Sequence, residues 1–339
     1  MNISEIAQKA GVSVATVSRV INHSNLVKPE TRERVMRVVE ENEYVPNAIA
    51  RSLSVRSTSN IGVIFPDIEN PFFSGAFYGV TKAAEQNHYN VFFFNSDENV
   101  QKEQEFLKTV FSNNLAGIIV SPVDHYSDTT RELLEEIEKR GIPVVLLDRD
   151  IRGGKFSIVM ADNEKGAYEA VSRLIQEGHE RIAIIEGSTL TRPVYERSRG
   201  YRRAMDDHDI PIRGEYMVRG DQKSELAYQM TRQLMSLPEP PTAVFTCNNM
   251  MTLGCLRYLT EQGIMIGKDI SMIGFDDIEA LRVIDFKLSV VERSESDMGK
   301  IAMRMLLDRL AVPEAERETV VVPVKLVLRG SEKLQKKNV

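Results

Sequence analysis

The sequence predicts a small all-α helix-turn-helix headpiece followed by an α/β body of two doubly wound lobes with parallel sheets. Three observations lead to this fold class. Residues 1–46 have the pattern of three short helices, short apolar runs alternate with amphipathic helices from residue 59 onward, and this alternation restarts near residue 162. A chain of 339 residues is also too long for one hydrophobic core, so more than one unit is expected.

The first helix is expected over residues 4–10. Its apolar residues repeat at helical spacing and form one stripe, made of Ile3, Ile6, Ala7 and Ala10. Ser4 is the candidate N-cap, and no capping box is expected because the residue three positions on is Ala7. Gly11 is expected to end the helix, since glycine adopts a positive φ easily.

The second helix has the features of a helix that reads DNA. Ser13 can cap it, and its apolar face holds Val17, Val20 and Ile21. The opposite face is short and polar, so it can enter a major groove closely, and Arg19 can bind guanine through two hydrogen bonds. Two helices joined by a glycine turn are typical of the motif whose second helix presents its first residues to base edges. The residues expected to contact duplex DNA here are Ser13, Val14, Ala15, Thr16, Ser18, Arg19 and Asn22.

A third helix is expected to start near Pro29, a favourable residue for a first turn. Its valines would close a small core: Val35, Val38 and Val39. The alternative is that these are three ordinary helices of a larger domain. Their place at one end of the chain, with Pro46 behind them, favours an appended module.

Residues 47–58 form a short basic connection. Asn47 can cap a segment from Ala48 to Leu53, which is too short to be a stable helix alone in water. The composition fits two alternatives equally: a plain linker, or a hinge helix that folds on DNA and inserts a leucine wedge into the minor groove. In the second case the DNA contacts would come from Ala50, Arg51 and Leu53.

The charge of the chain is uneven. The whole chain carries −6, whereas residues 1–57 contain eight Lys and Arg against six Asp and Glu, a net charge of +2. The rest of the chain therefore carries −8, and this difference directs DNA toward the headpiece.

Cysteine content and hydropathy predict the compartment. The two cysteines, Cys247 and Cys255, suit a reducing cytosol better than a disulfide framework. Neither a signal-peptide pattern nor an apolar run of ~20 residues is present in the sequence, so we expect a cytoplasmic protein without a membrane partner.

The body has repeated strand–helix alternation. Nearly continuous apolar runs are read as strands at 61–65, 91–94, 117–120, 143–148, 181–187, 216–221, 242–248 and 270–277. The helices between them are expected near 71–87, 101–112, 128–139, 163–177, 195–207, 224–236 and 250–262. Strand 288–292, helix 297–309 and a β-rich end at 320–330 come last. Continuously apolar strands predict parallel sheets covered on both faces.

Polar and aromatic residues gather at the predicted carboxyl ends of the strands, where open α/β sheets bind ligands. They are Asp67, Phe72, Phe73, Asp148, Arg149, Asp150, Arg192, Arg197, Asn248, Asn249, Asp276 and Asp277. Carboxylates, amides and an arginine beside aromatic rings suit a small polyhydroxylated molecule. The alternative is that the loop Asp and Asn residues cap helices, and for Asn248 and Asp276 both roles stay open.

The sequence gives no support for catalysis. It contains no G-x-S-x-G, no G-x-x-x-x-G-K-[ST] and no G-x-G-x-x-G motif, and its five histidines are scattered without metal-ligand spacing. We therefore expect no catalytic residues, no metal site and no cofactor. An enzyme that processes a small molecule is the remote alternative.

Four segments together resemble the lactose repressor family of bacterial regulators: GVSVATVSRVIN, TRERV, YVPNAIARSL and IGVIFPDIENPFF. The resemblance runs from Ile3 to about Gly330. It implies lobes like those of periplasmic sugar-binding proteins, with three chain crossings between them. Lobe one would comprise about 59–161 and 291–322, lobe two about 162–290 and 323–330, and 331–339 would be a tail.

The resemblance also implies effector contacts by Phe73, Asp148, Arg197, Asn248 and Asp276, to which the chemistry of the loop adds Phe72. The chain departs from the family at three places: Gln222 stands where an aromatic ring is common, Asn249 where Asp is usual, and Lys28 where Ser or Thr caps the third helix.

A transcriptional repressor of carbohydrate-metabolism genes is the expected function. It would bind a palindromic operator as a homodimer and be switched by a small molecule, a sugar or derivative, between its lobes. We expect it at the nucleoid of a bacterial cytoplasm. The alternative is a regulator of the same fold controlled by a partner protein or by a metabolite that is not a sugar.

Overall fold

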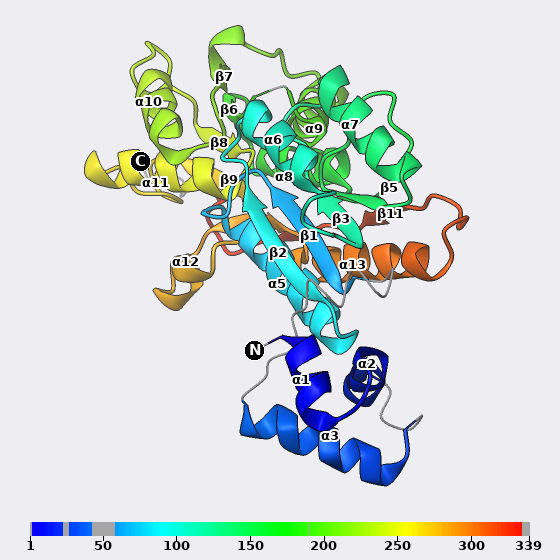
Figure 1. The fold of residues 1–339 in the computed structure, drawn as a ribbon. Coiled ribbons are helices and arrows are strands. Elements are labelled where there is room, and N and C mark those ends of the chain that lie inside the picture. The colour runs from blue at the N-terminus through cyan, green and yellow to red at the C-terminus, as the bar shows by residue number, and fades with distance from the viewer. Residues whose placement is uncertain (1, 23–26, 43–57, 189, 334–339) are drawn as a thin grey trace. The chain divides into compact units, whose positions relative to one another are not determined.

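The structure is a computed structural model that describes residues 2–22, 27–42, 58–188 and 190–333. The chain divides into two units, Met1–Thr58 and Ser59–Val339. We call them the headpiece and the body and describe each by itself; Figure 1 colours the headpiece blue and the body cyan to red.

Three helices make up the described headpiece: α1 (Ile3–Ala10), α2 (Val14–Asn22) and α3 (Pro29–Glu41). Their core contains Ile6, Ala7, Ala10, Val17, Val20 and Val35, all buried, with Val38 and Val39 packed against it. The predicted start of α3 at Pro29 is confirmed, and Lys28 makes no side-chain cap there. The predicted hinge segment, Ala48 to Leu53, lies outside the described residues.

The expected cap of α1 was wrong. Asn2 is the N-cap, and its Oδ1 accepts from the Glu5 backbone N–H at 3.0 Å while the Glu5 carboxylate accepts from the Asn2 N–H at 2.9 Å. This is a capping box, and it places Ser4 inside the helix. The other two predictions are confirmed: Gly11 ends α1 with φ +63°, and the Ser13 Oγ accepts from the Thr16 N–H at 3.2 Å.

The first sheet of the body has the strand order β11-β5-β4-β3-β1-β2, and all its strand pairs are parallel. Its strands are β1 (Asn60–Phe65), β2 (Asn90–Asn95), β3 (Gly117–Val120), β4 (Val144–Leu147), β5 (Ser157–Ala161) and β11 (Thr319–Val322). Two helices share a core on one face, and two more contribute to a separate core on the other (Figure 1): α5 (Pro71–Gln86) with α13 (Glu295–Ala311), and α6 (Val100–Thr109) with α7 (Asp128–Lys139). We call this half lobe one.

The second sheet has the order β12-β10-β9-β8-β6-β7, which repeats the first position by position. Its strands are β6 (Ile182–Glu186), β7 (Met217–Arg219), β8 (Ala243–Thr246), β9 (Ser271–Phe275), β10 (Ser289–Glu292) and β12 (Lys325–Val327). Its helices are α8 (Asn163–Gln176), α9 (Arg192–Asp207), α10 (Ser224–Met235), α11 (Asn249–Glu261) and the short α12 (Glu279–Val283), with a 3₁₀ turn at Gly214–Tyr216. This half is lobe two.

Two features of the sheets differ from the sequence prediction. Strand β5 was not predicted, because a run of five residues with Ser at one end and Met inside it gives a weak strand signal. Strand β12 pairs antiparallel with β10. Because β11 runs parallel to the strands of lobe one, it ends on the interlobe side, and two residues later the chain enters lobe two from that side, so β12 runs against the other strands of its sheet.

The chain crosses between lobes near Asp162, after Glu292 and at 323–324. The second crossing follows β10, so Val291 and Glu292 pair within the sheet of lobe two, rather than beginning the return to lobe one as expected. Ser331 and Glu332, expected in the tail, are buried in lobe two. There the Met272 N–H donates to the Ser331 carbonyl at 2.8 Å, and the Ser289 N–H donates to the Ser331 Oγ at 2.7 Å.

The two lobes pack their helices in the same way. The ninth residue of α5 is Gly79 and the ninth of α9 is Gly200. A Cβ on Gly79 would collide with the Ser296 carbonyl of α13, and one on Gly200 with the Glu164 carbonyl of α8. Glycine therefore lets each helix pair approach closely at its crossing.

Candidate functional site

All six residues that the sequence selected for ligand contact line one cavity between the lobes. They are Phe72, Phe73, Asp148, Arg197, Asn248 and Asp276, and they share the cavity with Asn70, Arg149, Thr191, Pro193, Val194, Gln222 and Arg293. The parallel strands of both sheets end on this side, which explains how residues far apart in the sequence meet here.

Asp148 and Asp276 occupy equivalent places in the two lobes, directly after β4 and after β9. Both have a left-handed backbone, with φ +65° and +70°. Their N–H groups donate to the neighbouring strand, Asp148 to the Val159 carbonyl at 2.7 Å and Asp276 to the Val291 carbonyl at 2.9 Å. This turn leaves each carboxylate at the cavity rather than at a helix cap.

Arg293 joins these two carboxylates, and sequence reasoning missed it. Its Nε donates to Asp276 Oδ1 at 2.7 Å and its Nη2 to Asp276 Oδ2 at 3.2 Å, while Nη1 donates to Asp148. The guanidinium lies 3.6 Å from the centre of the Phe72 ring. Burial disfavours its charge, yet the two carboxylates outweigh this and raise the pKa of Arg293. The available signal was its position directly after a strand end, the rule that selected the two Asp residues.

Arg197 is buried in lobe two without a carboxylate partner among the described residues. Its Nε and Nη2 donate to Asn163 Oδ1 at 2.9 and 2.8 Å, and Nη1 donates to the Cys247 carbonyl. Its guanidinium stacks 3.6 Å from the centre of the Phe275 ring. Burial, assisted by the charge of Arg293, lowers the pKa of Arg197 to about 10, because these two effects outweigh the opposing charges of Asp276 and Asp148.

Asn248 serves as a helix cap and still reaches the cavity. Its Oδ1 accepts from the Met251 N–H at 2.7 Å at the start of α11, and its Nδ2 donates to the Gln222 carbonyl at 3.1 Å. Gln222 has φ +71°, a left-handed backbone typical of a tight loop. Its side-chain amide stands where many family members have an aromatic ring.

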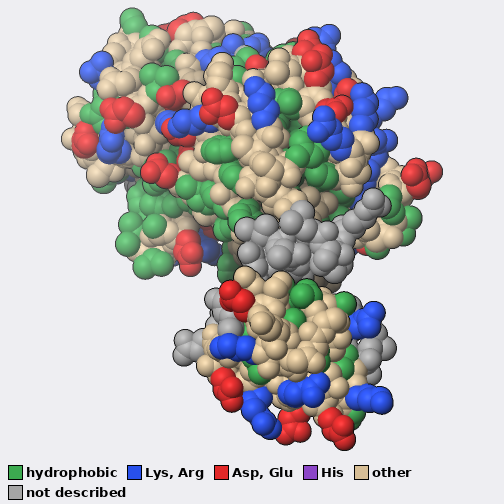
Figure 2. Space-filling model, in the orientation of Figure 1, with side chains coloured by type: hydrophobic (Ala, Val, Ile, Leu, Met, Phe, Trp, Pro, Cys, Tyr) green, Lys and Arg blue, Asp and Glu red, His purple; other side chains and the backbone are tan. Residues whose placement is uncertain are grey.

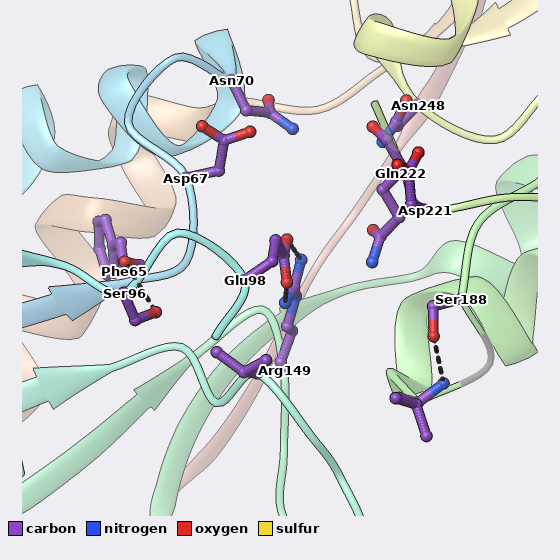
Figure 3. A network of polar contacts seen from close by, with 12 residues as sticks. Phe65, Asp67, Asn70, Ser96, Glu98, Arg149, Ser188, Asp221, Gln222 and Asn248 are labelled. Carbon is purple, nitrogen blue, oxygen red and sulfur yellow. Dashed lines mark hydrogen bonds and ion pairs between the residues drawn. The ribbon is translucent and has the colours of Figure 1, made fainter. Parts of the chain in front are cut away.

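The rim of the cavity is charged. Figure 3 shows Arg149 paired with Glu98 on the side of lobe one, and Gln222 and Asn248 across from them. The Arg149 Nη atoms donate to the two Glu98 oxygens at 2.8 and 2.7 Å. Burial raises the pKa of the half-buried Asp67 carboxyl nearby, with the charge of Glu98 adding to the effect.

Three further polar contacts join the lobes around the cavity. Arg192 donates to Asp150 at 2.9 Å, Lys223 to Asp97 at 3.4 Å, and the His125 N–H to the Leu190 carbonyl at 2.8 Å. The cavity holds only about 20 Å³, enough for roughly one water molecule. The lobes must therefore separate before a metabolite can enter.

The predicted DNA-reading residues that the structure describes lie at the start of α2 and along it. Ser13, Ala15 and Arg19 are exposed, and Val14 is 43 % exposed although it is apolar. Thr16 and Ser18 are half-buried, and the Thr16 hydroxyl is 2.9 Å from that of Ser13. Figure 2 shows basic and acidic side chains interspersed on the visible face of this unit. The Asn22 side chain and residues Ala50, Arg51 and Leu53 lie outside what the structure describes.

Within the described ranges, no group of three or more His, Cys, Asp or Glu is arranged to hold a metal ion. Cys247 and Cys255 are buried free thiols. None of the described helices combines the length and apolar character that a membrane crossing needs.

Residues 2–47 match the family described as bacterial regulatory proteins of the lacI family, and residues 61–311 match the periplasmic binding protein domain. Catabolite control protein A of Priestia megaterium is 33 % identical over 335 residues, 98 % of this chain and 99 % of that protein. The transcriptional regulator CelR in its cellobiose complex is 28 % identical with a TM-score of 0.73, covering 98 % of this chain and 99 % of the other. The lac repressor dimer bound to operator and the anti-inducer ONPF has a TM-score of 0.85 at 24 % identity, over 98 % and 99 % of the two chains, a likeness of fold alone.

Proposed function

Since the chain belongs to the lacI family of bacterial regulatory proteins, and is thus a DNA-binding, effector-regulated transcriptional repressor, we propose that it binds a palindromic operator as a homodimer, with a small molecule between its lobes setting operator affinity. One observation carries the second half of this proposal: residues of both lobes line one cavity and are joined across it by Arg293. A ligand that replaces this bridge changes how the lobes meet.

The DNA contacts are assigned to α2 and the hinge. Arg19 would bind guanine and Val14 would contact a thymine methyl group, with further contacts from Ser13, Ala15, Thr16, Ser18 and Asn22. An exposed apolar side chain at the start of α2 supports this assignment. Ala50, Arg51 and Leu53 would fold in the minor groove, with Leu53 as the wedge.

A homodimer is proposed because one headpiece reads few base pairs and a palindrome needs two. The body offers an apolar surface at α12, where Val283 and Ile284 are 78 % and 70 % exposed. No residue of α12 is buried in lobe two, and Figure 2 shows hydrophobic side chains gathered near this helix. Burial against a second copy would remove that surface from water.

The ligand is proposed to be a sugar or derivative. Asp148 and Asp276 can accept hydrogen bonds from hydroxyl groups, and Phe72 and Phe73 offer ring faces to an apolar sugar face. Ligand binding would change the lobe arrangement and hence the spacing of the two hinge segments in the dimer. An effector acts in this way if it favours one arrangement by typically 1–3 kcal/mol. Regulation of carbohydrate genes at the nucleoid of the bacterial cytoplasm follows from the same proposal.

In vitro selection from random duplex DNA tests the function. The protein should enrich a palindrome, and anisotropy should show an affinity that falls steeply with salt, with a log–log slope of several units for a dimer. Arg19→Ala should weaken the selected site about five-fold or more, because a bidentate contact to a base is worth about 1–3 kcal/mol.

Arg37→Ala is the matched control, because Arg37 is an exposed arginine on α3 of the same headpiece. It should change affinity by less than the Arg19 substitution. A pool without any enriched sequence, or equal losses for the two variants, would refute the assignment of α2.

A further inference from the structure

We propose that the cleft takes a ligand with an anionic head group, a carboxylate or a phosphate, seated at the start of α9 between Thr191 and Arg197. This inference rests on the proposed function, because it names the ligand class of the same cavity. Three features of lobe two carry it: a hydroxyl without a hydrogen-bond partner, an open helix N-terminus and a buried cation without an ion pair of its own in the described structure.

The hydroxyl belongs to Thr191. Its side chain is 3 % exposed, and its Oγ1 has no hydrogen-bond partner in the described structure. Thr191 holds the N-cap position of α9 but makes no side-chain cap. It lines the interlobe cavity together with Pro193, Val194 and Arg197. A buried hydroxyl without a partner is unfavourable, so an acceptor on a ligand would satisfy it.

The first turn of α9 adds to this. No acidic residue lies in it, and Pro193 has no N–H, which leaves the Arg192 and Val194 amides among the donors that a helix start cannot satisfy internally. The positive end of a 16-residue helix therefore faces the cavity wall. Helix starts of this kind bind carboxylates and phosphates.

Arg197 supplies the charge. Its three nitrogens donate to an amide oxygen and a carbonyl oxygen, which are neutral acceptors. Of the five N–H groups of a guanidinium, two are left for another partner. A buried cation is usually paired with an anion, because neutral groups compensate its charge poorly.

The other charges of the cavity are already paired. Arg293 binds Asp148 and Asp276, and Arg149 binds Glu98. A neutral sugar would leave Arg197 as it is, whereas an anionic head would pair with it and accept from Thr191. Phe72, Phe73 and Asn248 on the remaining walls would then contact the polyhydroxylated part of the ligand.

Calorimetry with matched pairs tests the inference on the full-length protein. The acids are D-glucuronate, D-galacturonate, D-gluconate and D-glucose 6-phosphate; their neutral counterparts are D-glucose, D-galactose and D-glucitol. Inorganic phosphate alone is included. At least one acid should bind ten-fold or more tightly than its counterpart. Binding of a sugar acid identifies a carboxylate head, and binding of the sugar phosphate identifies a phosphate head.

Three variants distinguish the contribution of the Thr191 hydroxyl to ligand binding from effects of substitution in general. Thr191→Val should weaken the bound acid about ten-fold, as expected for a lost hydrogen bond to a charged group. Thr191→Ser keeps the hydroxyl and should stay within about three-fold of the original affinity. Thr260→Val on the exposed face of α11 is the matched control and should change nothing.

The inference is overturned if neutral sugars bind as tightly as their acids, if none of the acids binds, or if Thr191→Val keeps full affinity for an acid. Operator selection reports on the proposed function separately. If the protein binds an acid but selects no operator, the proposed function is contradicted. If it selects an operator but prefers a neutral sugar, only the proposed anionic head group is contradicted.

Discussion

Lobe one and lobe two share a backbone plan and differ in the side chains at their strand ends. The strand orders match position by position, and Gly79 and Gly200 stand at the same place in their helices. Asp148 and Asp276 follow equivalent strands with the same left-handed backbone. The shared features are those that set helix packing and the cavity wall.

The differences lie at the helix starts that face the cavity. In lobe one Asn70 caps α5, accepting from the Phe72 N–H at 3.0 Å, and two phenylalanines follow. In lobe two Thr191 leaves α9 uncapped, and Arg197 lies behind it. Lobe one thus offers ring faces and lobe two offers hydrogen-bond donors, so a duplicated fold obtains an asymmetric site from a few substitutions.

The second crossing between the lobes also combines a shared backbone plan with a different side chain. In lobe one, strand β5 is followed directly by Asp162, the N-cap of α8. In lobe two, Arg293 lies between strand β10 and Ser294, the N-cap of α13. Arg293→Met leaves two carboxylates in the cavity without their cation and should lower the free energy of unfolding by about 3–5 kcal/mol in urea titrations.

Arg304→Met is the control for that variant. Arg304 pairs with Glu318 at 3.3 Å, but the two side chains are 55 % and 48 % exposed, so its loss should stay below about 1 kcal/mol. If the two variants lower the free energy of unfolding equally, the cavity is open to water and the Arg293 bridge does not stabilise the fold.

The equivalence of the helix crossings is tested by Gly79→Ala and Gly200→Ala. Each added methyl group meets a backbone carbonyl of the crossing helix, so each should lower the free energy of unfolding by about 2–3 kcal/mol. Lys82→Ala on the exposed side of α5 should stay within about 0.5 kcal/mol. A large effect at only one glycine would show that the two crossings are not equivalent.

A buried carboxyl distinguishes α6 from α10. The fourth residue of α6 is Glu103, fully buried, and the fourth of α10 is Ala227. Glu103 accepts from the Val123 N–H at 2.8 Å and the Thr130 hydroxyl at 3.0 Å, yet burial raises its pKa to about 7.

The folded state therefore binds this proton more tightly than the unfolded chain does. Stability from Glu103 should be fully present below about pH 4.5 and lost as pH rises through about 7, with roughly 2 kcal/mol of the loss falling between pH 5.5 and 8. Glu103→Gln should flatten the unfolding free energy measured between pH 5.5 and 8. A residual slope is expected from Glu295, whose pKa burial also raises to about 7. An unaltered slope in the variant would contradict the assignment.

The smallest effects are expected at the two caps. Asn70→Ala removes a cap hydrogen bond and should cost about 1 kcal/mol of unfolding free energy. Thr191→Ala removes none and should cost only a few tenths of that, measured by thermal unfolding. If the two substitutions cost the same, Thr191 stabilises α9 and the contrast between the helix starts disappears.

Periodicity was sufficient to predict most elements. Helices of the headpiece follow from their apolar stripes, and buried parallel strands follow from continuous apolar runs. Strand β5 was not predicted, because the sequence of a short strand with Ser and Met resembles that of a loop. The three crossings came only from the family resemblance, since composition carries no information on which sheet a late strand joins.

The site followed from one rule, that ligands bind at the carboxyl ends of parallel strands. This rule brought Phe72, Asp148 and Arg197 together correctly in one cavity. It was not applied to the end of the late strand β10, and so it passed over Arg293, and it also passed over Thr191. The role of Arg293 depends on the two carboxylates that it bridges, and that of Thr191 on a hydrogen bond left unmade, and only the coordinates show these contacts.

The late strands have a consequence for synthesis on the ribosome. Lobe one lacks β11 and lobe two lacks β12 until residues 319–327 have emerged, although most of lobe one was made some 150 residues earlier. Until then β5 and β10 are exposed sheet edges, which readily pair with other chains. The nascent body therefore carries an open sheet edge at β5 until β11 is made, and the two lobes gain their last strands within a few residues of each other.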